Sequence, residues 1–358
     1  MAIFQELEKG KSQVCSPLSA QAVLALTALG SGGDTRKELL QAMALPDDEA
    51  IRSLFGYLTS TLNSIHTVKL RFANRIYVSK HGTLKPGIQK DSVEVFGSSL
   101  QQVDFMEKEG AADSINKWIA AKTNNMIRNI VSPDSLHYAT RLLLVNAIYF
   151  QGTWEKPFEK DLTKERIFHV NNRDTVEVPM MFMDEEYFRY RHSPELKAQL
   201  LQMNYKGRQA SMILIVPDAV EGLGAMLQQL SDHDLMDEVA VMRATRTEVM
   251  IPKFKIETDI NLEELLPKMG IHDIFDQNKS DIRMFTSDDR MCVTQAIQRA
   301  VIEVNETGTE AAACTLTAIS EICAVIELEP PKRFVADRPF LYLLLARGVP
   351  TFIGVYHQ

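Results

Sequence analysis

The stretch ETGTEAAACTLTA at residues 306–318 directly follows the run AVIEVN at 300–305, whose β-branched residues predict a strand. In an extended conformation alternate side chains share a face. One such face would hold only small or uncharged side chains: Thr309, Ala311, Ala313, Thr315 and Thr317. A stretch of this composition is usually a helix or a surface linker. Its uniform small face also predicts a loop that can enter an existing sheet as a new strand.

Length and charge limit the class of protein. The chain has 358 residues, 45% hydrophobic and 24% charged, which is typical of a globular protein of one large or two modest domains. Its net charge of −8 and isoelectric point near 5.6 disfavour a nucleic-acid partner, because binding phosphates needs a basic surface. No apolar run reaches the length of a membrane span, so we expect no membrane partner. The longest runs, 142–150 and 340–346, predict buried strands.

Helical and strand patterns follow one another without a linker, which predicts an α+β fold. Ser16 with Pro17 predicts the start of a helix and Gly30 its end, while Thr35 and Glu38 predict a capping box for the next helix. Further predicted helices cover 48–65, 111–130 and 262–269, and predicted strands cover 68–78, 199–204, 211–216 and 248–257. A hairpin is predicted from 340–345 and 351–356. The helix at 111–130 carries an apolar stripe that predicts packing against a sheet: Ile115, Trp118, Ile119, Met126, Ile127 and Ile130.

Motifs for catalysis and metal binding are missing from the sequence. Gly10-Lys11-Ser12 is similar to the end of a phosphate-binding loop, but Gln5 stands where that loop needs glycine. There is no GxSxG or HExxH motif. The four cysteines, Cys15, Cys292, Cys314 and Cys323, show neither CxxC pairs nor metal-ligand spacing. We therefore expect no catalytic residue, no metal and no cofactor, and no enzyme activity.

Six stretches, in order along the chain, resemble the serpin family of protease inhibitors. They are SPLSAQAVLALTALGSGGDT (16–35), SINKWI (114–119), LVNAIYFQGTWEKPF (144–158), MNYKGRQASMILIVP (203–217), IPKFKIE (251–257) and ADRPFLY (336–342). The ending DRPFLYLLLARGVPTFIG (337–354) is most similar to arthropod members. The resemblance covers nearly the whole chain and implies a single serpin domain, 1–358, with three β-sheets and eight or nine helices.

The resemblance also implies a mechanism. Serpins expose a reactive loop, here about 306–333, which a target serine protease attacks to form an acyl-enzyme. The cleaved loop then inserts into the central sheet of a kinetically trapped fold and distorts the protease, so that inhibition is irreversible. The hinge pattern of inhibitory members is matched by Glu306, Gly308, Thr309, Glu310, Ala311, Ala312, Ala313 and Cys314. We expect a monomer whose partner is the covalently bound protease.

The cleaved bond follows from two ways of counting. The family's usual spacing from the hinge glycine implies cleavage between Ile322 and Cys323. Counting back from ADRPF implies Val325 or Ile326, and a shift of one residue implies Glu321. Most of these candidates are apolar, and within the loop no Lys or Arg occurs before Lys332. We therefore expect an elastase-like or chymotrypsin-like target. A protease specific for acidic residues is the alternative at Glu321.

Further positions match the family around its central sheet. Ser16, Ser19 and Asn146 correspond to a polar network beneath the sheet, and Trp154 lies where the loop first inserts. Gln298 replaces the family's histidine in this network. Because a glutamine amide also donates and accepts hydrogen bonds, we expect a network of altered geometry.

Two questions stay open from the sequence. The resemblance favours secretion, because most members of the family are secreted, and the sequon Asn278-Lys279-Ser280 is consistent with a glycosylated protein. The unpaired cysteines and a second sequon at Asn305 favour the cytoplasm. We expect an extracellular protein, with a cytoplasmic one as the alternative. The alternative function is a non-inhibitory serpin that acts as a carrier, chaperone or binding scaffold.

Overall fold

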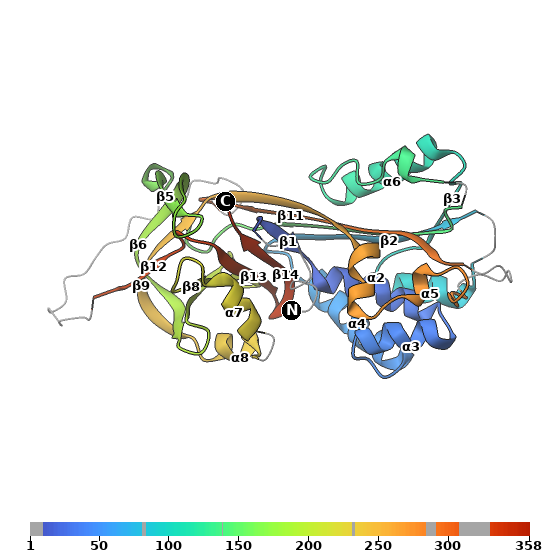
Figure 1. The fold of residues 1–358 in the computed structure, drawn as a ribbon, viewed down its shortest axis with the longest axis horizontal. Coiled ribbons are helices and arrows are strands. Elements are labelled where there is room, and N and C mark those ends of the chain that lie inside the picture. Colours follow the sequence, from blue (N-terminus) through green and yellow to red (C-terminus); the bar gives the residue numbers. More distant parts are fainter. Residues whose placement is uncertain (1–9, 81–83, 138, 231–232, 284–290, 308–329) are drawn as a thin grey trace. The chain divides into compact units, whose positions relative to one another are not determined.

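The computed structural model describes residues 10–80, 84–137, 139–230, 233–283, 291–307 and 330–358. They form two compact units whose sequence ranges alternate. The first unit comprises Met1–Phe150, Ile256–Ile302 and Leu343–Gly354, and the second comprises Gln151–Lys255, Glu303–Tyr342 and Val355–Gln358. The described residues contain eight α-helices and a larger number of strands, which is the predicted α+β class (Figure 1).

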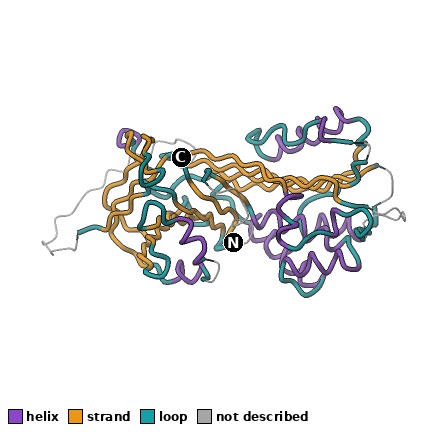
Figure 2. Tube along the Cα trace, in the orientation of Figure 1, coloured by secondary structure: helices purple, strands orange, loops and turns teal. Residues whose placement is uncertain are grey.

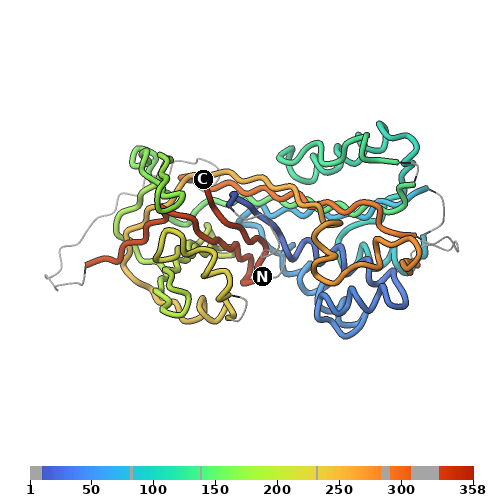
Figure 3. The backbone as a smooth tube through the Cα atoms, viewed as in Figure 1, coloured from blue at the N-terminus to red at the C-terminus, as the bar shows by residue number. Residues whose placement is uncertain are grey.

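A five-stranded sheet forms the centre of the first unit. Its order is β10 (Phe254–Asn261), β11 (Val293–Val304), β4 (Leu142–Gln151), β2 (Lys69–Ser79) and β3 (Gln101–Val103). Nine of the ten residues of β4 are buried, as its apolar run predicted. Strands β11 and β4 are far apart in the sequence but run parallel as neighbours (Figure 3). In this pairing Gln298 lies opposite Asn146.

Helices cover both faces of this sheet. Helix α6 (Lys108–Lys122) lies on one face, and α2 (Pro17–Leu29) and α4 (Asp48–Asn63) lie on the other (Figures 1 and 2). The predicted stripe of α6 is confirmed, because Ile115 and Ile119 are fully buried in one core with residues of β2 and β4. The other helices of this unit are α3 (Gly33–Ala42), α5 (Pro86–Glu94) and α9 (Leu262–Leu265).

The predicted limits of the first helix are confirmed. Ser16 caps α2 by accepting a hydrogen bond from the Ser19 N–H, and the helix ends before Gly30. The predicted capping box of the next helix is wrong, because α3 begins at Gly33 and includes Thr35 in its first turn. The Glu38 carboxylate instead accepts hydrogen bonds from the N–H groups of His272 and Asp273, where another helical turn begins.

Three predicted elements are interrupted. Helix α6 ends at Lys122 and not at residue 130, because the chain adopts positive φ at Asn124 and Asn125, a conformation that asparagine tolerates. The strand predicted at 248–257 is two strands, β9 (Arg243–Pro252) and β10. The helix predicted at 262–269 is α9 followed by a 3₁₀ turn at Pro267–Met269, since proline lacks the N–H that would continue the helix.

The second unit contains a sheet in the order β8, β7, β6, β9, β12, and β5 also pairs with β6. Their bounds are β5 Lys164–His169, β6 Thr175–Ser193, β7 Ala198–Asn204, β8 Ala210–Pro217, β9 Arg243–Pro252 and β12 Lys332–Val335, with helices α7 (Leu223–Gln229) and α8 (Leu235–Ala240). The first part of β6 pairs with β5 and its last part with β7. Strand β6 therefore places β5 and β7 in the same sheet, and the described strands form two sheets in place of the three that were expected.

The C-terminal hairpin is confirmed. Strands β13 (Phe340–Ala346) and β14 (Val349–Tyr356) are neighbours, and β1 (Gln13–Cys15) lies beside β14. Arg347 and Gly348 connect them with φ of 52° and 78°, the positive values of a two-residue type I′ turn. None of the helices in the described ranges is long and apolar enough to cross a membrane.

Candidate functional site

The residues predicted to act in inhibition fall partly inside the described structure. Strand β11 ends at Val304, and the described chain continues to Thr307. The hinge residues Gly308, Thr309, Glu310, Ala311, Ala312, Ala313 and Cys314, and the cleavage candidates Glu321, Ile322, Cys323, Val325 and Ile326, lie outside the described residues. The other predicted residues form two clusters, one in each unit.

The parallel direction of β11 and β4 determines how an additional strand would pair with them. Strands β11 and β4 are parallel neighbours from the pair Val293 and Leu142 to the pair Ile302 and Phe150. A segment that follows β11 and turns back along it would be antiparallel to β11, and therefore also to β4. Such a strand would form antiparallel ladders on both of its edges, which are slightly more stable per residue than a parallel ladder.

The first cluster lies in the first unit, where the Gln298 amide connects β11 to β4 and to the start of α2. Its Oε1 accepts from the Ser16 N–H at 2.9 Å, and its Nε2 donates to the Ser16 carbonyl at 3.0 Å and to Asn146 Oδ1 at 2.7 Å. Gln298 and Asn146 are each 1% exposed, so water does not compete for these bonds. The glutamine thus uses its acceptor and both donors at the position of the family's histidine.

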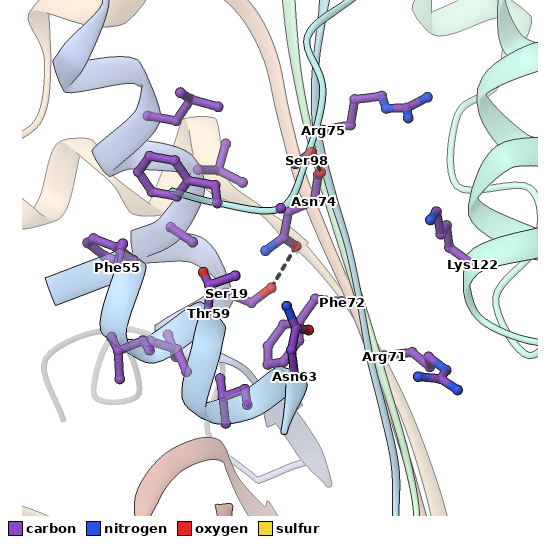
Figure 4. A pocket seen from close by; sticks show the side chains of 18 of the residues that line it. Ser19, Phe55, Thr59, Asn63, Arg71, Phe72, Asn74, Arg75, Ser98 and Lys122 are labelled. Carbon is purple, nitrogen blue, oxygen red and sulfur yellow. Dashed lines mark hydrogen bonds between the residues drawn. The ribbon is translucent and has the colours of Figure 1, made fainter. Parts of the chain in front are cut away.

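The same network continues to a third strand through Asn74 on β2. Asn146 Nδ2 donates to Ser19 Oγ at 2.6 Å and to Asn74 Oδ1 at 2.8 Å. Ser19 Oγ also donates to Asn74 Oδ1 at 2.8 Å (Figure 4). Asn74 was not predicted to belong to this network. Asparagine is depleted in strands, so a polar amide within the predicted strand 68–78 was the available signal. The network therefore connects three neighbouring strands of the sheet to helix α2.

The second cluster lies in the second unit around Trp154, which follows β4 in the chain. Its backbone N–H donates to the Thr307 carbonyl at 3.0 Å, and its indole Nε1 donates to the Asn305 carbonyl at 2.9 Å. The indole ring stacks on Tyr205 with ring centroids 4.2 Å apart, and burial raises the pKa of Tyr205 well above its usual value. Trp154 therefore fastens the segment after β4 to the segment after β11.

Glu306 anchors the base of the predicted loop in the same cluster. Its carboxylate accepts hydrogen bonds from Lys253 Nζ at 3.0 Å and from Thr163 Oγ1 at 3.1 Å, and its carbonyl accepts from the Phe158 N–H at 2.8 Å. Burial alone would raise the pKa of Glu306. The hydrogen bonds from its own backbone, Lys253 and Thr163, with the positive charge of Lys253, outweigh burial and lower this pKa below its ordinary value.

Neither described cysteine has the environment of a reactive thiol. Cys15 is fully buried, and burial raises its pKa to about 12; burial also raises the pKa of Cys292. In the described part of the chain, no group of three or more His, Cys, Asp or Glu side chains is placed to hold a metal ion. The features that the two clusters share are hydrogen bonds that hold strands and loop ends in place.

Comparison with known proteins agrees with this arrangement. The chain matches the family described as serpin (serine protease inhibitor) over residues 1–358. It is 40% identical to "Antichymotrypsin-2" of Bombyx mori, over 99% of this chain and 95% of that protein. It is also 40% identical to "Antitrypsin" of Bombyx mori, over 99% of this chain and 91% of that protein.

A solved structure of the same fold superposes on nearly the whole chain. The crystal structure of Serpin48, a highly specific serpin of the insect Tenebrio molitor, superposes with a TM-score of 0.87 at 31% identity, covering 99% of this chain and 94% of that one. The fold and the family model match over almost the entire chain. The chain therefore belongs to the serpin family of serine protease inhibitors, which are not enzymes.

Proposed function

We propose that this serpin is an irreversible, suicide-substrate inhibitor of elastase-like or chymotrypsin-like serine proteases. The protease cleaves the loop after one of the candidate residues from 321 to 326 and remains attached as an acyl-enzyme. The free end of the loop then inserts between β11 and β4 and carries the protease with it. The acyl bond forms with the protease's own nucleophile, so the inhibitor needs no catalytic group.

The parallel pairing of β11 and β4 is the observation that carries this proposal. The chain leaves β11 at Val304, so a returning strand would be antiparallel to both neighbours. The face that would point inward carries small and uncharged side chains from Thr309 to Thr317, which do not resist burial. The direction of the two strands and the small side chains of the loop both support inhibition by insertion.

Target specificity rests on the loop sequence. The two Bombyx mori relatives carry the names antichymotrypsin and antitrypsin at the same 40% identity, so overall similarity does not decide between them. In this chain no Lys or Arg lies between residues 300 and 331. A trypsin-like protease, which needs a basic residue before the cleaved bond, therefore has no suitable site in the loop before Lys332.

The proposal is tested by incubating the protein with neutrophil elastase, chymotrypsin, trypsin and a papain-type protease. We expect a complex with elastase or chymotrypsin that survives denaturing electrophoresis, and a released C-terminal peptide that begins at Cys323. A peptide beginning at residue 322, 326 or 327 would move the cleaved bond to one of the alternatives. Cleavage by each protease without any stable complex would contradict inhibition and favour a non-inhibitory serpin.

We also propose that the protein is extracellular. The Asn278 side chain of the sequon Asn278-Lys279-Ser280 is exposed, so a glycan there would not disturb the fold. Asn305 is half-buried, and its Oδ1 accepts from the Thr307 N–H and hydroxyl, so a glycan there would disrupt the anchored base of the loop. Detection of the protein in the medium of its own cells, with a glycan on Asn278 only, would support this; retention in the cytoplasm would contradict it.

A further inference from the structure

A cavity of about 260 Å³ lies in the first unit between α2, α4 and β2 (Figure 4). Its lining is apolar and polar in similar measure, and Phe55 and Phe96 form part of the apolar wall with ring centroids 5.3 Å apart. On the side of β2 that faces α2 and α4, the polar lining residues include Ser19, Asn74 and Asn63 (Figure 4). This volume is several times that of a single water molecule, about 30 Å³ in the liquid, so the cavity can hold more than isolated waters.

Three cations border the same cavity from the other side of β2. Figure 4 shows Arg71, Arg75 and Lys122 across the strand from Phe72 and Ser19. The cavity reaches both sides because β3 pairs with β2 only at Tyr77–Ser79, so the earlier part of β2 forms an open edge. Among the described residues, no aspartate or glutamate lines the cavity, although the whole chain carries a net charge of −8.

These cations are not neutralised within the described structure. No carboxylate of the described residues forms an ion pair with Arg71, Arg75 or Lys122. The Arg75 guanidinium lies 3.8 Å from the centre of the Trp118 ring, and its Nη2 donates to Ser99 Oγ at 2.9 Å. Its Nε is buried and has no hydrogen-bond acceptor among the described residues. A buried donor without a partner costs stability, so this side of the cavity favours an added anionic acceptor.

We propose that the cavity binds a monocarboxylate with an apolar tail, of the medium-chain fatty-acid class. The tail lies on Phe55, Phe72 and Phe96, and the ionised carboxylate lies at the open edge of β2 near Arg71 and Arg75. Each part of the ligand then has a chemically matched surface. An uncharged chain would leave the cations unpaired, and a small anion would leave the apolar walls empty.

Occupation of the cavity would also act on the central sheet. Ser19 and Asn74 line the cavity and belong to the hydrogen-bond network that joins β2, β4 and β11. A ligand packed against them adds contacts that only the folded first unit offers. Binding should therefore raise the midpoint of thermal unfolding as ligand concentration rises.

The first experiment uses octanoate with the unmodified protein and no protease, so it is independent of the proposed inhibition. Calorimetry should show one saturable site, and the unfolding midpoint should rise with concentration. Octyltrimethylammonium, which has the same chain and the opposite charge, should bind at least about tenfold more weakly. Equal binding of the two probes, or no saturable binding of octanoate, would overturn the proposal.

Variants then locate the site. The double change Arg71→Gln with Arg75→Gln should weaken octanoate binding by about tenfold, the effect of losing charge-assisted hydrogen bonds. Ala22→Phe should abolish binding by filling the cavity while keeping its charges. Arg166→Gln, which removes an exposed charge on β5, is the matched control and should bind octanoate as the unmodified protein does.

Folding of each variant is checked by circular dichroism and by its unfolding midpoint without ligand. If a cavity variant does not fold, the comparison of the two oppositely charged probes on the unmodified protein still decides the outcome. Octanoate that binds folded Ala22→Phe as tightly as the unmodified protein would place the binding elsewhere and overturn the assignment.

Discussion

Gln298 supplies three of the hydrogen bonds that join β11, β4 and α2. Gln298→Ala would leave the Ser16 N–H and Asn146 Oδ1 without these partners in a buried site. We expect the free energy of unfolding to fall by about 2–4 kcal/mol, since each unsatisfied buried group costs about 1–3 kcal/mol. Urea unfolding measures this loss.

The same strand offers a matched control for Gln298. Gln295 is half-buried on β11, and its Oε1 has no hydrogen-bond partner in the structure. Gln295→Ala should therefore cost clearly less stability than Gln298→Ala. Equal losses for the two variants would show that the network does not stabilise the folded state.

Glu306 gives the base of the loop a dependence on pH. The pKa of Glu306 is lower in the folded protein than in the unfolded chain, where it is 4.5. The ionised carboxylate therefore contributes its full stabilisation above pH 4.5, and this stabilisation is lost as the pH falls through the folded-state pKa. Glu306→Gln should reduce the free energy of unfolding at pH 7, and the difference from the unmodified protein should shrink as the pH falls below about 4.5. Urea titrations at several pH values test this.

An exposed glutamate provides the comparison. Glu165 lies exposed on β5, and Glu165→Gln should not reproduce the pH-dependent difference. A difference between Glu306→Gln and the unmodified protein that stayed constant down to pH 3 would mean that the carboxylate charge does not matter at this site.

At the scale of elements, the alternation of side chains along the loop becomes a test of insertion. Ala311→Arg places a charge on the face that would point into the molecule, and Glu310→Arg places the same charge on the opposite face. Burying an unpaired charge costs several kcal/mol, so Ala311→Arg should be cleaved by elastase without trapping it. Glu310→Arg should still form the stable complex. Gel densitometry gives the fraction trapped, and equal trapping by both variants would contradict insertion with this alternation.

The elements also show what sequence patterns can and cannot predict. Strand β4 and helix α2 were predicted closely, because a long apolar run and a Ser-Pro start each depend on local chemistry. The end of α6 was not, because Asn124 and Asn125 turn the chain while Ile127 and Ile130 still join the same core. Apolar periodicity reports which residues are buried, and it does not report whether a helix continues between them.

In the candidate site, too, some residues were predictable from the sequence and others were not. The family resemblance indicated Ser16, Ser19, Asn146 and Gln298, but neither residue patterns nor resemblance indicated Asn74. Its role depends on β2 lying beside β4, and Lys253 meets Glu306 only because the chain folds back over 53 residues. Partners that are distant in sequence depend on topology, which a single sequence expresses only weakly.

For the whole molecule, insertion predicts that the cleaved protein is more stable than the intact one. Cleavage within 321–326 would release a strand that adds two antiparallel ladders to the five-stranded sheet. We expect the unfolding midpoint to rise after limited cleavage in this region, and differential scanning calorimetry before and after cleavage measures it. The Ala311→Arg variant should show no such rise, and a decrease for the unmodified protein would contradict a trapped native state.

The short strand β12 has a consequence for how long the protein keeps its activity in storage. In the described residues β12 pairs with β9 at four positions, from Lys332 with Thr247 to Val335 with Met250, and Arg333 forms an ion pair with the partly buried Glu248. An uncut loop can enter the sheet along its full length only if these pairs separate. Shelf life should therefore depend on this edge more than on the core, and ageing without any protease should inactivate the inhibitor by the detachment of β12.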